Sequence, residues 1–383
     1  MRKRPLHVLM ISTIFYPKVN GTVIAVTNLL KCLREHGCKV RLVTRKLPGT
    51  VPTEGWQNIP VVRVGPSFKS PFSRLALSWN QVLAGISIMK KEHIDIIHVH
   101  GAHSLLAGLM LGKLFRKPVV ATFHGFQRLW FKSARWKPEL NLTLTYPIYR
   151  MLIHRANAIV AQSQTLKKVI AQLYGIDPKK IRVIPHAIDE ERFKFVPAPS
   201  AEPTVLFIGS LVRVQGVELL VKAVPTILED FPQTKFIIVG SGPQKEPLQR
   251  LIESLKLEKS VFLIGPIYNQ TELAKYYSSA SVVVIPIKYG GYILSLVALE
   301  AMSTGRPVVT TMTLDPELDK YGVHKAGFDP AELAEAIKEI LSLDEEEYST
   351  LAAYARKYVE ERCSKKIVAS EVENLYRHLI ETF

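Results

Sequence analysis

The chain of 383 residues lacks the features of a metal-binding or disulfide-stabilised protein. Its three cysteines are Cys32, Cys38 and Cys363, and their spacing fits neither a zinc site nor an obvious disulfide pair. No Asp-x-Asp pair and no His/Cys cluster indicates a bound metal. So few cysteines favour a reducing compartment, and we expect no metal site and no resident cofactor.

Long apolar runs are missing as well. The longest, residues 75–89 and 102–115, are interrupted and shorter than the ~20 residues needed to cross a bilayer. The basic N-terminus is not followed by a secretory apolar segment, because polar residues interrupt that run and Pro17 ends it. We therefore expect a chain that is soluble or lies on a membrane without crossing it.

Acidic residues are scarce in the first half. Residues 1–196 hold 31 Lys/Arg and 9 Asp/Glu, whereas residues 197–383 hold 19 and 25. A strongly basic half indicates an anionic partner, which could be a membrane surface, phospholipid or nucleic acid. A solvated basic surface without a partner is the alternative reading.

What the sequence does contain is a strand–helix alternation that occurs twice. Apolar strands and amphipathic helices alternate up to about residue 189, a Pro-rich linker follows at 193–204, and the alternation restarts. Such alternation predicts parallel, doubly wound α/β sheets that bind ligands at the carboxyl ends of their strands. We predict two Rossmann-like domains, residues 1–196 and 197–364, with a final helix at 365–383 that packs back on the first domain.

The most informative stretch is residues 281–311, which reads as strand, glycine turn, helix and strand. Glycines before a helix leave backbone N–H groups and a positive dipole end available for a phosphate. Glu300 lies inside the apolar helix, where an unpaired carboxylate is costly. We expect it to face a polar ligand or a paired donor, although a purely structural role is equally compatible with the local sequence.

This stretch resembles the donor-site signature of retaining glycosyltransferases of the GT-B fold, family four. The matching positions are Pro286, Glu300, Ala301, Met302, Gly305, Pro307, Val308 and Val309. The resemblance extends over nearly the whole chain and implies that a nucleotide sugar linked to UDP, GDP or ADP binds to the second domain and an acceptor to the first. It also implies a metal-independent hexosyltransferase that retains the anomeric configuration.

Three charged positions of the signature are altered. Tyr292 stands where the family has the first Glu of a Glu-x7-Glu pair, and Ser210 and Gln215 stand where it has the Arg and Lys that clamp the diphosphate. Arg213 and Lys288 are nearby candidates to supply that charge. With Glu300 holding the ribose, the predicted donor-binding residues are Gly21, Ser210, Arg213, Gln215, Gly242, Ile267, Lys288, Gly290, Gly291, Tyr292, Ser295 and Glu300.

The first half contributes a glycine loop and histidines at strand ends. The resemblance places the Asn20-Gly21 loop against the donor diphosphate and the acceptor, although an ordinary βα turn would look the same. It makes His124 a contact of the transferred sugar, so we assign His124 and Glu300 the catalytic roles. Alternation places His98 and His100 on one face of a strand; we expect His98 in the core and His100 at the rim of the cleft.

Residues 126–141 interleave basic and aromatic side chains. This mixture is typical of a lipid headgroup interface, but it could also stack on nucleic acid or form a flap over the acceptor. We favour an anionic membrane surface and no nucleic acid. The predicted acceptor or membrane contacts are Asn20, His100, Arg128, Trp130, Lys132, Arg135, Trp136 and Lys137.

These observations predict a cytoplasmic enzyme, peripheral on the inner membrane face, that glycosylates a lipid, lipid-linked or glycan hydroxyl. The altered donor positions leave a second possibility open. In that case the chain is a catalytically silent homologue that acts as a membrane- or sugar-nucleotide-binding partner subunit.

Overall fold

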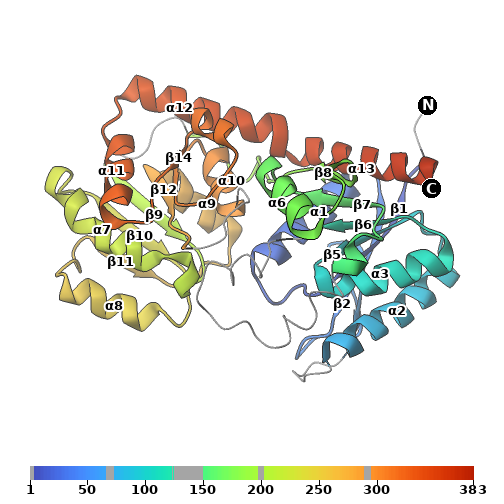
Figure 1. Cartoon of the computed structure of the whole chain (residues 1–383). Coiled ribbons are helices and arrows are strands. Elements are labelled where there is room, and N and C mark those ends of the chain that lie inside the picture. The colour runs from blue at the N-terminus through green and yellow to red at the C-terminus, as the bar shows by residue number, and fades with distance from the viewer. Residues whose placement is uncertain (1–3, 66–72, 123, 125–149, 197–201, 289–294) are drawn as a thin grey trace. The chain divides into compact units, whose positions relative to one another are not determined.

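The computed structural model describes residues 4–65, 73–122, 124, 150–196, 202–288 and 295–383. The chain divides into two compact units, each built on its own sheet (Figure 1). Among its described residues, unit 1 runs to Ala187 and resumes at Lys365, and unit 2 runs from Ile188 to Ser364.

Unit 1 is an eight-stranded sheet in the order β3-β4-β2-β1-β5-β6-β7-β8. Every pairing is parallel except that between β3 and β4, and the central strands are buried and apolar, as strands covered on both faces are. The strands are β1 (His7–Ser12), β2 (Lys39–Arg45), β3 (Thr53–Trp56), β4 (Ile59–Val64), β5 (Ile96–His100), β6 (Val119–Thr122), β7 (Ala158–Ala161) and β8 (Ile181–Val183).

Helices cover this sheet, and the last helix of the chain is one of them. The helices of unit 1 are α1 (Gly21–Glu35), α2 (Ser73–Lys91), α3 (Ala102–Phe115), α6 (Gln164–Tyr174) and α13 (Lys365–Thr382). Val368, Val372 and Tyr376 of α13 belong to the same buried core as α1 and β1. The C-terminal helix therefore completes the core of unit 1.

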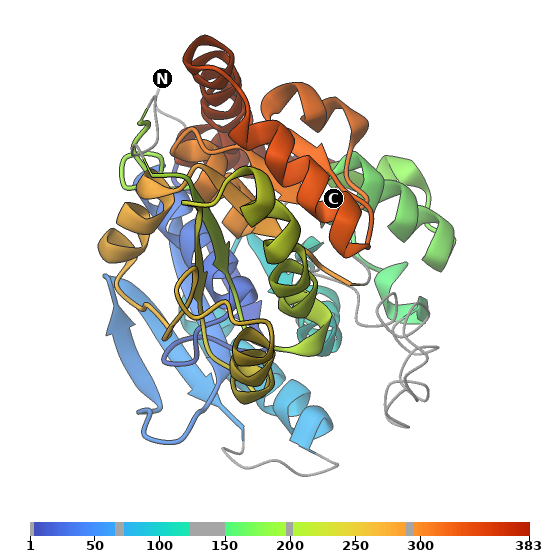
Figure 2. The ribbon, with the colours of Figure 1, turned by 90° about the vertical axis from the view of Figure 1, so that its left-hand side faces the viewer.

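Unit 2 is a parallel six-stranded sheet in the order β11-β10-β9-β12-β13-β14. Its strands are β9 (Thr204–Ile208), β10 (Lys235–Val239), β11 (Val261–Ile264), β12 (Val282–Ile285), β13 (Val308–Thr310) and β14 (Val323–Lys325). Its helices are α7 (Val217–Asp230), α8 (Lys245–Ser254), α9 (Gln270–Ser279), α10 (Leu296–Ser303), α11 (Pro330–Leu341) and α12 (Glu345–Tyr358). Figure 2 views this unit with α7, α8 and α11 toward the reader.

The two parallel-sheet α/β units are the predicted fold class, but the division between them falls earlier than the predicted 196–197 boundary. The backbone N–H of Ile188 donates a hydrogen bond to the carbonyl oxygen of Cys363 (2.8 Å), and Phe193 is buried against the ring of Tyr277. Residues 188–196 therefore pack into unit 2, because they carry apolar side chains and backbone groups that this unit satisfies.

Two further features bear on the sequence analysis. Residues 53–64 form an antiparallel hairpin of β3 and β4 at the edge of an otherwise parallel sheet, which the predicted strand–helix alternation does not include. Among the helices that the structure describes, none combines the length and apolarity that a bilayer crossing requires.

Candidate active site

Glu300 lies in α10 and is buried there with only 4% of its surface exposed. Ser295 begins this helix as its N-cap, and its side chain accepts a hydrogen bond from the Ala298 N–H (3.2 Å). The Tyr277 hydroxyl of α9 donates to Glu300 Oε2 at 2.7 Å. The carboxylate therefore has a paired donor, one of the two environments that we expected for it.

The pKa of Glu300 lies near neutral pH. Burial raises the pKa of Glu300 to about 7, while the bond from Tyr277 and the charge of Arg192 act in the opposite direction. An ionised carboxylate accepts hydrogen bonds only, as recognition of a ribose diol requires, whereas the protonated form also donates. The charge state of this group therefore changes within the physiological pH range.

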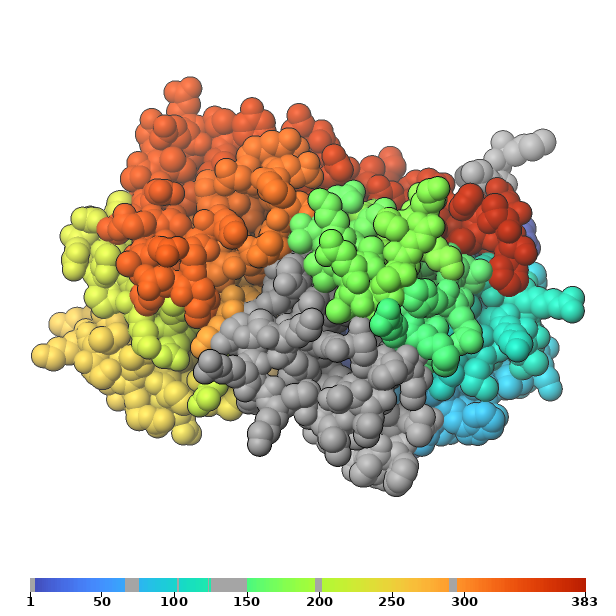
Figure 3. Space-filling view, in the orientation of Figure 1, coloured from blue at the N-terminus to red at the C-terminus, as the bar shows by residue number. Residues whose placement is uncertain are grey.

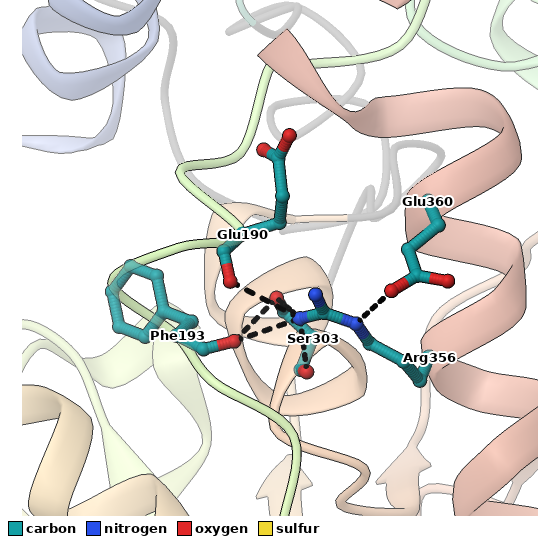
Figure 4. A network of polar contacts seen from close by, with 5 residues as sticks. All are labelled: Glu190, Phe193, Ser303, Arg356 and Glu360. Atoms are coloured by element: carbon teal, nitrogen blue, oxygen red, sulfur yellow. Dashed lines mark hydrogen bonds and ion pairs between the residues drawn. The ribbon is translucent and has the colours of Figure 1, made fainter.

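Arg356 of α12 fixes the C-terminal end of α10 (Figure 4). Its Nη1 lies within hydrogen-bond distance of the carbonyl oxygens of Ser303 (2.9 Å), Phe193 (3.0 Å) and Glu190 (3.2 Å). Its Nε donates to Glu360 at 2.6 Å. One guanidinium thus joins α12, α10 and residues 190–193, and it holds the helix that carries Glu300.

Glycines let the loops at the carboxyl ends of the strands of unit 2 pack backbone against backbone. A Cβ atom at Gly240 would lie 1.9 Å from the Gly209 carbonyl oxygen, and one at Gly242 would lie 2.4 Å from that of Leu211. Both glycines have φ values that other residues rarely adopt, +152° and +155°. The loops after β9 and β10 are therefore joined, as a Rossmann-like ligand site requires.

The loop after β9 also contacts the end of β12. A Cβ atom at Gly216 would lie 1.7 Å from the Pro286 carbonyl oxygen, and the Lys288 N–H donates to the Val214 carbonyl at 2.9 Å. Gln215 lies in the same loop, in a 3₁₀ turn with Arg213. This contact brings Arg213 and Lys288 to the same edge of the sheet.

Arg213 and Lys288 share an electrostatic neighbour, Glu218, in the first turn of α7. The hydrogen bond from Lys222 lowers the pKa of Glu218, and the charges of Lys288 and Arg213 lower it further. Lys288 also lies over the Phe328 ring, 5.8 Å from its centroid. The charges of three cations therefore stabilise this one exposed carboxylate, which also lies in the first turn of α7, where an anion is favoured.

Of the other predicted donor residues, two are described and the rest lie outside the described residues. Ser210 precedes the 3₁₀ turn and is exposed, and Ile267 follows β11 and is half-buried. Gly290, Gly291 and Tyr292, and likewise Arg128, Trp130, Lys132, Arg135, Trp136 and Lys137, lie outside the described residues.

In unit 1, Asn20 and Gly21 form the N-terminus of α1. The Asn20 side chain accepts from the Val23 N–H at 2.9 Å and caps the helix. A Cβ atom at Gly21 would meet nothing within 4 Å. Packing within unit 1 therefore does not require a glycine at position 21, and the close approach of a ligand would explain it. The helix cap explains Asn20.

Four histidines stand in a row in unit 1. The rings of His98 and His100 are 4.3 Å apart between centroids, so the two side chains share one face of β5 as expected. His100 Nδ1 lies 2.9 Å from His124 Nε2, and the His124 ring stacks on that of His186 at 5.6 Å. His98 and His100 are each 1% exposed, so the prediction of His100 at a rim is wrong: it is buried.

Burial keeps this histidine row neutral. It lowers the pKa of His98 to about 3 and that of His186 to about 4, and it holds the pKa values of His100 and His124 well below their usual range. His100 Nε2 and His124 Nδ1 are buried polar atoms without a hydrogen-bond partner among the described residues.

Sequence reasoning missed several residues that complete these environments. Tyr277 and Arg192 surround Glu300, and His186 and Tyr376 extend the histidine row, with Tyr376 2.5 Å from His98 Nδ1. His186 follows a strand, as His124 does, and could have been found by that signal. Tyr277 and Tyr376 lie in amphipathic helices, where an aromatic residue indicates only core.

Comparison with known families gives two adjoining matches. Residues 19–192 match Glycosyltransferase Family 4, and residues 202–343 match Glycosyl transferases group 1. The two matches follow the order of the two units along the chain.

Three relatives are similar over much of the chain. An uncharacterized glycosyltransferase of Methanocaldococcus jannaschii is 27% identical over 95% of both chains. The D-inositol 3-phosphate glycosyltransferase of Xylanimonas cellulosilytica is 26% identical over 88% of this chain and 86% of its own. A human phosphatidylinositol N-acetylglucosaminyltransferase subunit is 27% identical over 69% of this chain and 54% of its own.

Solved structures with the same fold are also found. Sucrose-phosphate synthase from Thermosynechococcus elongatus superposes with a TM-score of 0.83 at 24% identity, covering 99% of this chain and all of its own. A protein of Anabaena in complex with UDP-glucose gives 0.75 at 18% identity, covering 97% of this chain and all of its own.

Proposed function

Since the chain belongs to the family-four, group 1 glycosyltransferases and has their GT-B fold, we propose that it transfers a sugar from a nucleotide sugar to a hydroxyl of a lipid, lipid-linked or glycan molecule at a membrane surface. We propose further that the reaction retains the anomeric configuration and needs no metal.

The Glu300–Tyr277 pair carries the assignment of the donor site. It is a carboxylate in an otherwise apolar helix, with a pKa of about 7 and a hydroxyl partner, within a parallel α/β unit. We propose that ionised Glu300 accepts the ribose hydroxyls. The loops joined at Gly216, together with Arg213 and Lys288, would hold the diphosphate, replacing the charge that Ser210 and Gln215 do not supply.

The proposed step is a substitution at the anomeric carbon of the donor sugar. The bond from this carbon to the diphosphate oxygen breaks, and a bond to the acceptor oxygen forms on the same face. The acceptor proton passes to the leaving diphosphate, whose negative charge Arg213 and Lys288 stabilise. A neutral His124 is suited to orient the sugar, since its ring can donate and accept hydrogen bonds without adding charge.

Two observations support a lipid or lipid-linked acceptor. One relative is named for phosphatidylinositol and another for D-inositol 3-phosphate. The basic half of the chain, with 31 Lys/Arg against 9 Asp/Glu in residues 1–196, suits an anionic surface. We propose a peripheral position on the inner, cytoplasmic face of the membrane, with residues 126–141 contributing to the contact.

Titration with UDP-, GDP- and ADP-linked sugars, followed by calorimetry, tests the donor site. Glu300→Gln should weaken binding of the preferred donor by roughly tenfold to a hundredfold, since it removes a charged acceptor of hydrogen bonds. Glu258→Gln, an exposed carboxylate of the same unit, is the matched control and should bind as the wild type does. Equal binding by Glu300→Gln and wild type would refute the assignment.

The stereochemistry and metal dependence need separate measurements. Proton NMR of the product formed from an α-linked donor should give an α-linkage, and activity should be unchanged by EDTA. A β-linked product or loss of turnover on chelation would reject the corresponding part of the proposal.

A silent partner subunit remains the second candidate, because Ser210 and Gln215 lack the charge of the family positions. This candidate predicts that the chain binds a donor without turning it over, or that it does not bind a donor at all. Turnover of any one donor with a lipid extract or an inositol phosphate as acceptor decides in favour of the enzyme.

A further inference from the structure

Helices α2 and α3 of unit 1 expose four large apolar side chains. On α2 these are Trp79, 57% exposed, and Leu83, 50% exposed; on α3 they are Met110, 39% exposed, and Leu114, 60% exposed. Each pair is spaced i, i+4, so each helix presents its pair on one side. We name the outward surfaces of these two helices the α2–α3 face.

The inward surfaces of the two helices pack against each other. Ser78 donates to the His103 carbonyl at 2.9 Å, and Gln81 lies 3.3 Å from Ser104. Gly85 lies against the Leu111 side chain so closely that a Cβ atom would approach it to 2.3 Å. The helices therefore lie side by side, as Figures 1 and 3 show, and the apolar side chains that remain exposed are not needed for the core.

The charged side chains of the two helices have one sign. Exposed basic residues lie near the C-terminal ends of both helices, at Lys90, Lys91, Lys113 and Arg116. Neither α2 nor α3 contains an acidic residue.

The segment between the helices holds two carboxylates, and both are engaged. Glu92 is paired with Arg41 at 2.5 Å, and Asp95 is buried and bonded to Arg4, His93 and the His7 N–H. Neither carboxylate offsets the basic charge of the α2–α3 face, which therefore combines exposed apolar side chains with uncompensated positive charge.

We propose that the α2–α3 face docks on an anionic lipid bilayer, with Trp79, Leu83, Met110 and Leu114 in the interface and the basic residues against the headgroups. Aromatic and aliphatic side chains next to Lys and Arg are the composition of an interfacial helix. This inference rests on the proposed function, since it names the surface by which the enzyme would reach a lipid acceptor.

The charge argues against a second copy of the chain as the occupant. A two-fold dimer through this face would set the same basic residues against one another. A bilayer supplies both an apolar layer and the opposite charge.

Flotation with vesicles made of equal parts phosphatidylcholine and phosphatidylglycerol tests the face. Trp79→Ala should lower the partition coefficient roughly tenfold, and Lys113→Glu should lower it roughly fivefold to twentyfold at low salt and less at high salt. The matched control variants are Tyr354→Ala and Lys275→Glu, which change exposed residues of unit 2 of the same kinds and should partition as the wild type does. Thermal unfolding confirms that each variant is folded.

Three results would overturn the inference. Equal losses in Lys113→Glu and Lys275→Glu would mean that only net charge matters. Unchanged flotation of Trp79→Ala, with losses on replacing Lys132 and Lys137, would transfer the contact to residues 126–141. A dimer in sedimentation that Trp79→Ala dissociates would make a second copy the occupant.

Turnover with a water-soluble acceptor separates this inference from the proposed function. If the chain turns over but its flotation does not depend on these residues, the docking face fails and the enzyme stands. If flotation depends on them and no donor is bound, the face stands and the enzyme fails.

Discussion

The Tyr277 hydroxyl donates a 2.7 Å hydrogen bond to Glu300 Oε2 inside unit 2. The two residues come from α9 and α10, and both are buried. Burial raises the pKa of the Glu300 carboxyl to about 7 and that of the Tyr277 hydroxyl well above its usual value. At neutral pH the phenol therefore stays a donor, and the Glu300 carboxyl is near its pKa of about 7.

The raised pKa of Glu300 predicts how stability and donor binding depend on pH. In the unfolded chain the group ionises near pH 4.5, so between about pH 4.5 and 7 the folded state binds more protons and its stability falls as the pH rises. Glu300→Gln removes this penalty, and at pH 8 it should be more stable than the wild type by roughly 2–3 kcal/mol, with little difference at pH 4.5. Urea unfolding at the two pH values measures this.

Donor binding should depend on pH with the opposite sign. If the ionised carboxylate holds the ribose, affinity rises as the pH increases through about 7. Tyr277→Phe removes a donor that stabilises the charged form, so its binding curve should move to higher pH. Calorimetry across pH 5.5–8.5, taken in steps of about half a unit, checks both curves, and pH-independent binding in the wild type would contradict them.

The histidine row of unit 1 predicts a second pH effect. Burial depresses the pKa of His98 to about 3 and that of His186 to about 4, so below pH 6.5 the unfolded chain binds protons that the folded chain does not. Stability is therefore full above pH 6.5 and falls as the pH drops toward 4.

In this pH window each such histidine contributes about 1.4 kcal/mol per pH unit to the slope of the unfolding free energy. His186→Phe should reduce the slope of the unfolding free energy by about that amount, and His378→Phe, near the end of α13, serves as the control. Imidazole resonances of the wild type that titrate near pH 6.5 for all histidines would contradict the assignment.

The sequence predicted the layered architecture because each strand is a short apolar run and each helix has an apolar stripe. It predicted the parallel sheets of both units and the final helix, since these follow from periodicity along the chain. It did not predict β3, because the antiparallel pairing of Thr53–Trp56 with β4 depends on a partner rather than on its own residues.

The sites show the same limit. Glu300 was recognisable as a carboxylate in an apolar helix, yet its partner Tyr277 lies 23 residues earlier on another helix and carries no signal of its own. Likewise Arg356 binds carbonyls of residues 190–193 and Ser303, a relationship that only the folded chain creates. Such contacts between distant residues could not be predicted from the sequence. Every residue has the same backbone carbonyl, so no residue pattern indicates which one a distant side chain will bind.

The Arg356 guanidinium should be important for the stability of unit 2. Arg356→Ala leaves the carbonyls of Ser303, Phe193 and Glu190 without this donor, and we expect a loss of about 2–4 kcal/mol. Lys357→Ala is the matched control, because that side chain is 60% exposed and its ion pair spans 3.9 Å, so its loss should be near zero. Equal midpoints of chemical unfolding for the two variants would show that the Arg356 contacts contribute nothing.

Replacing Gly216 tests whether Arg213 and Lys288 bind the diphosphate together. A Cβ atom there would lie 1.7 Å from the Pro286 carbonyl oxygen, and φ is +68°, so Gly216→Ala must move the loop after β9 away from the end of β12. Because the movement separates the two cations, donor affinity should fall by roughly tenfold or more, whereas binding of the nucleoside alone should change little.

Gly265→Ala is the control, since a Cβ atom there meets nothing within 4 Å. Equal losses for nucleoside and donor in Gly216→Ala would indicate general damage to unit 2, and unchanged donor binding would remove Arg213 and Lys288 from the diphosphate site.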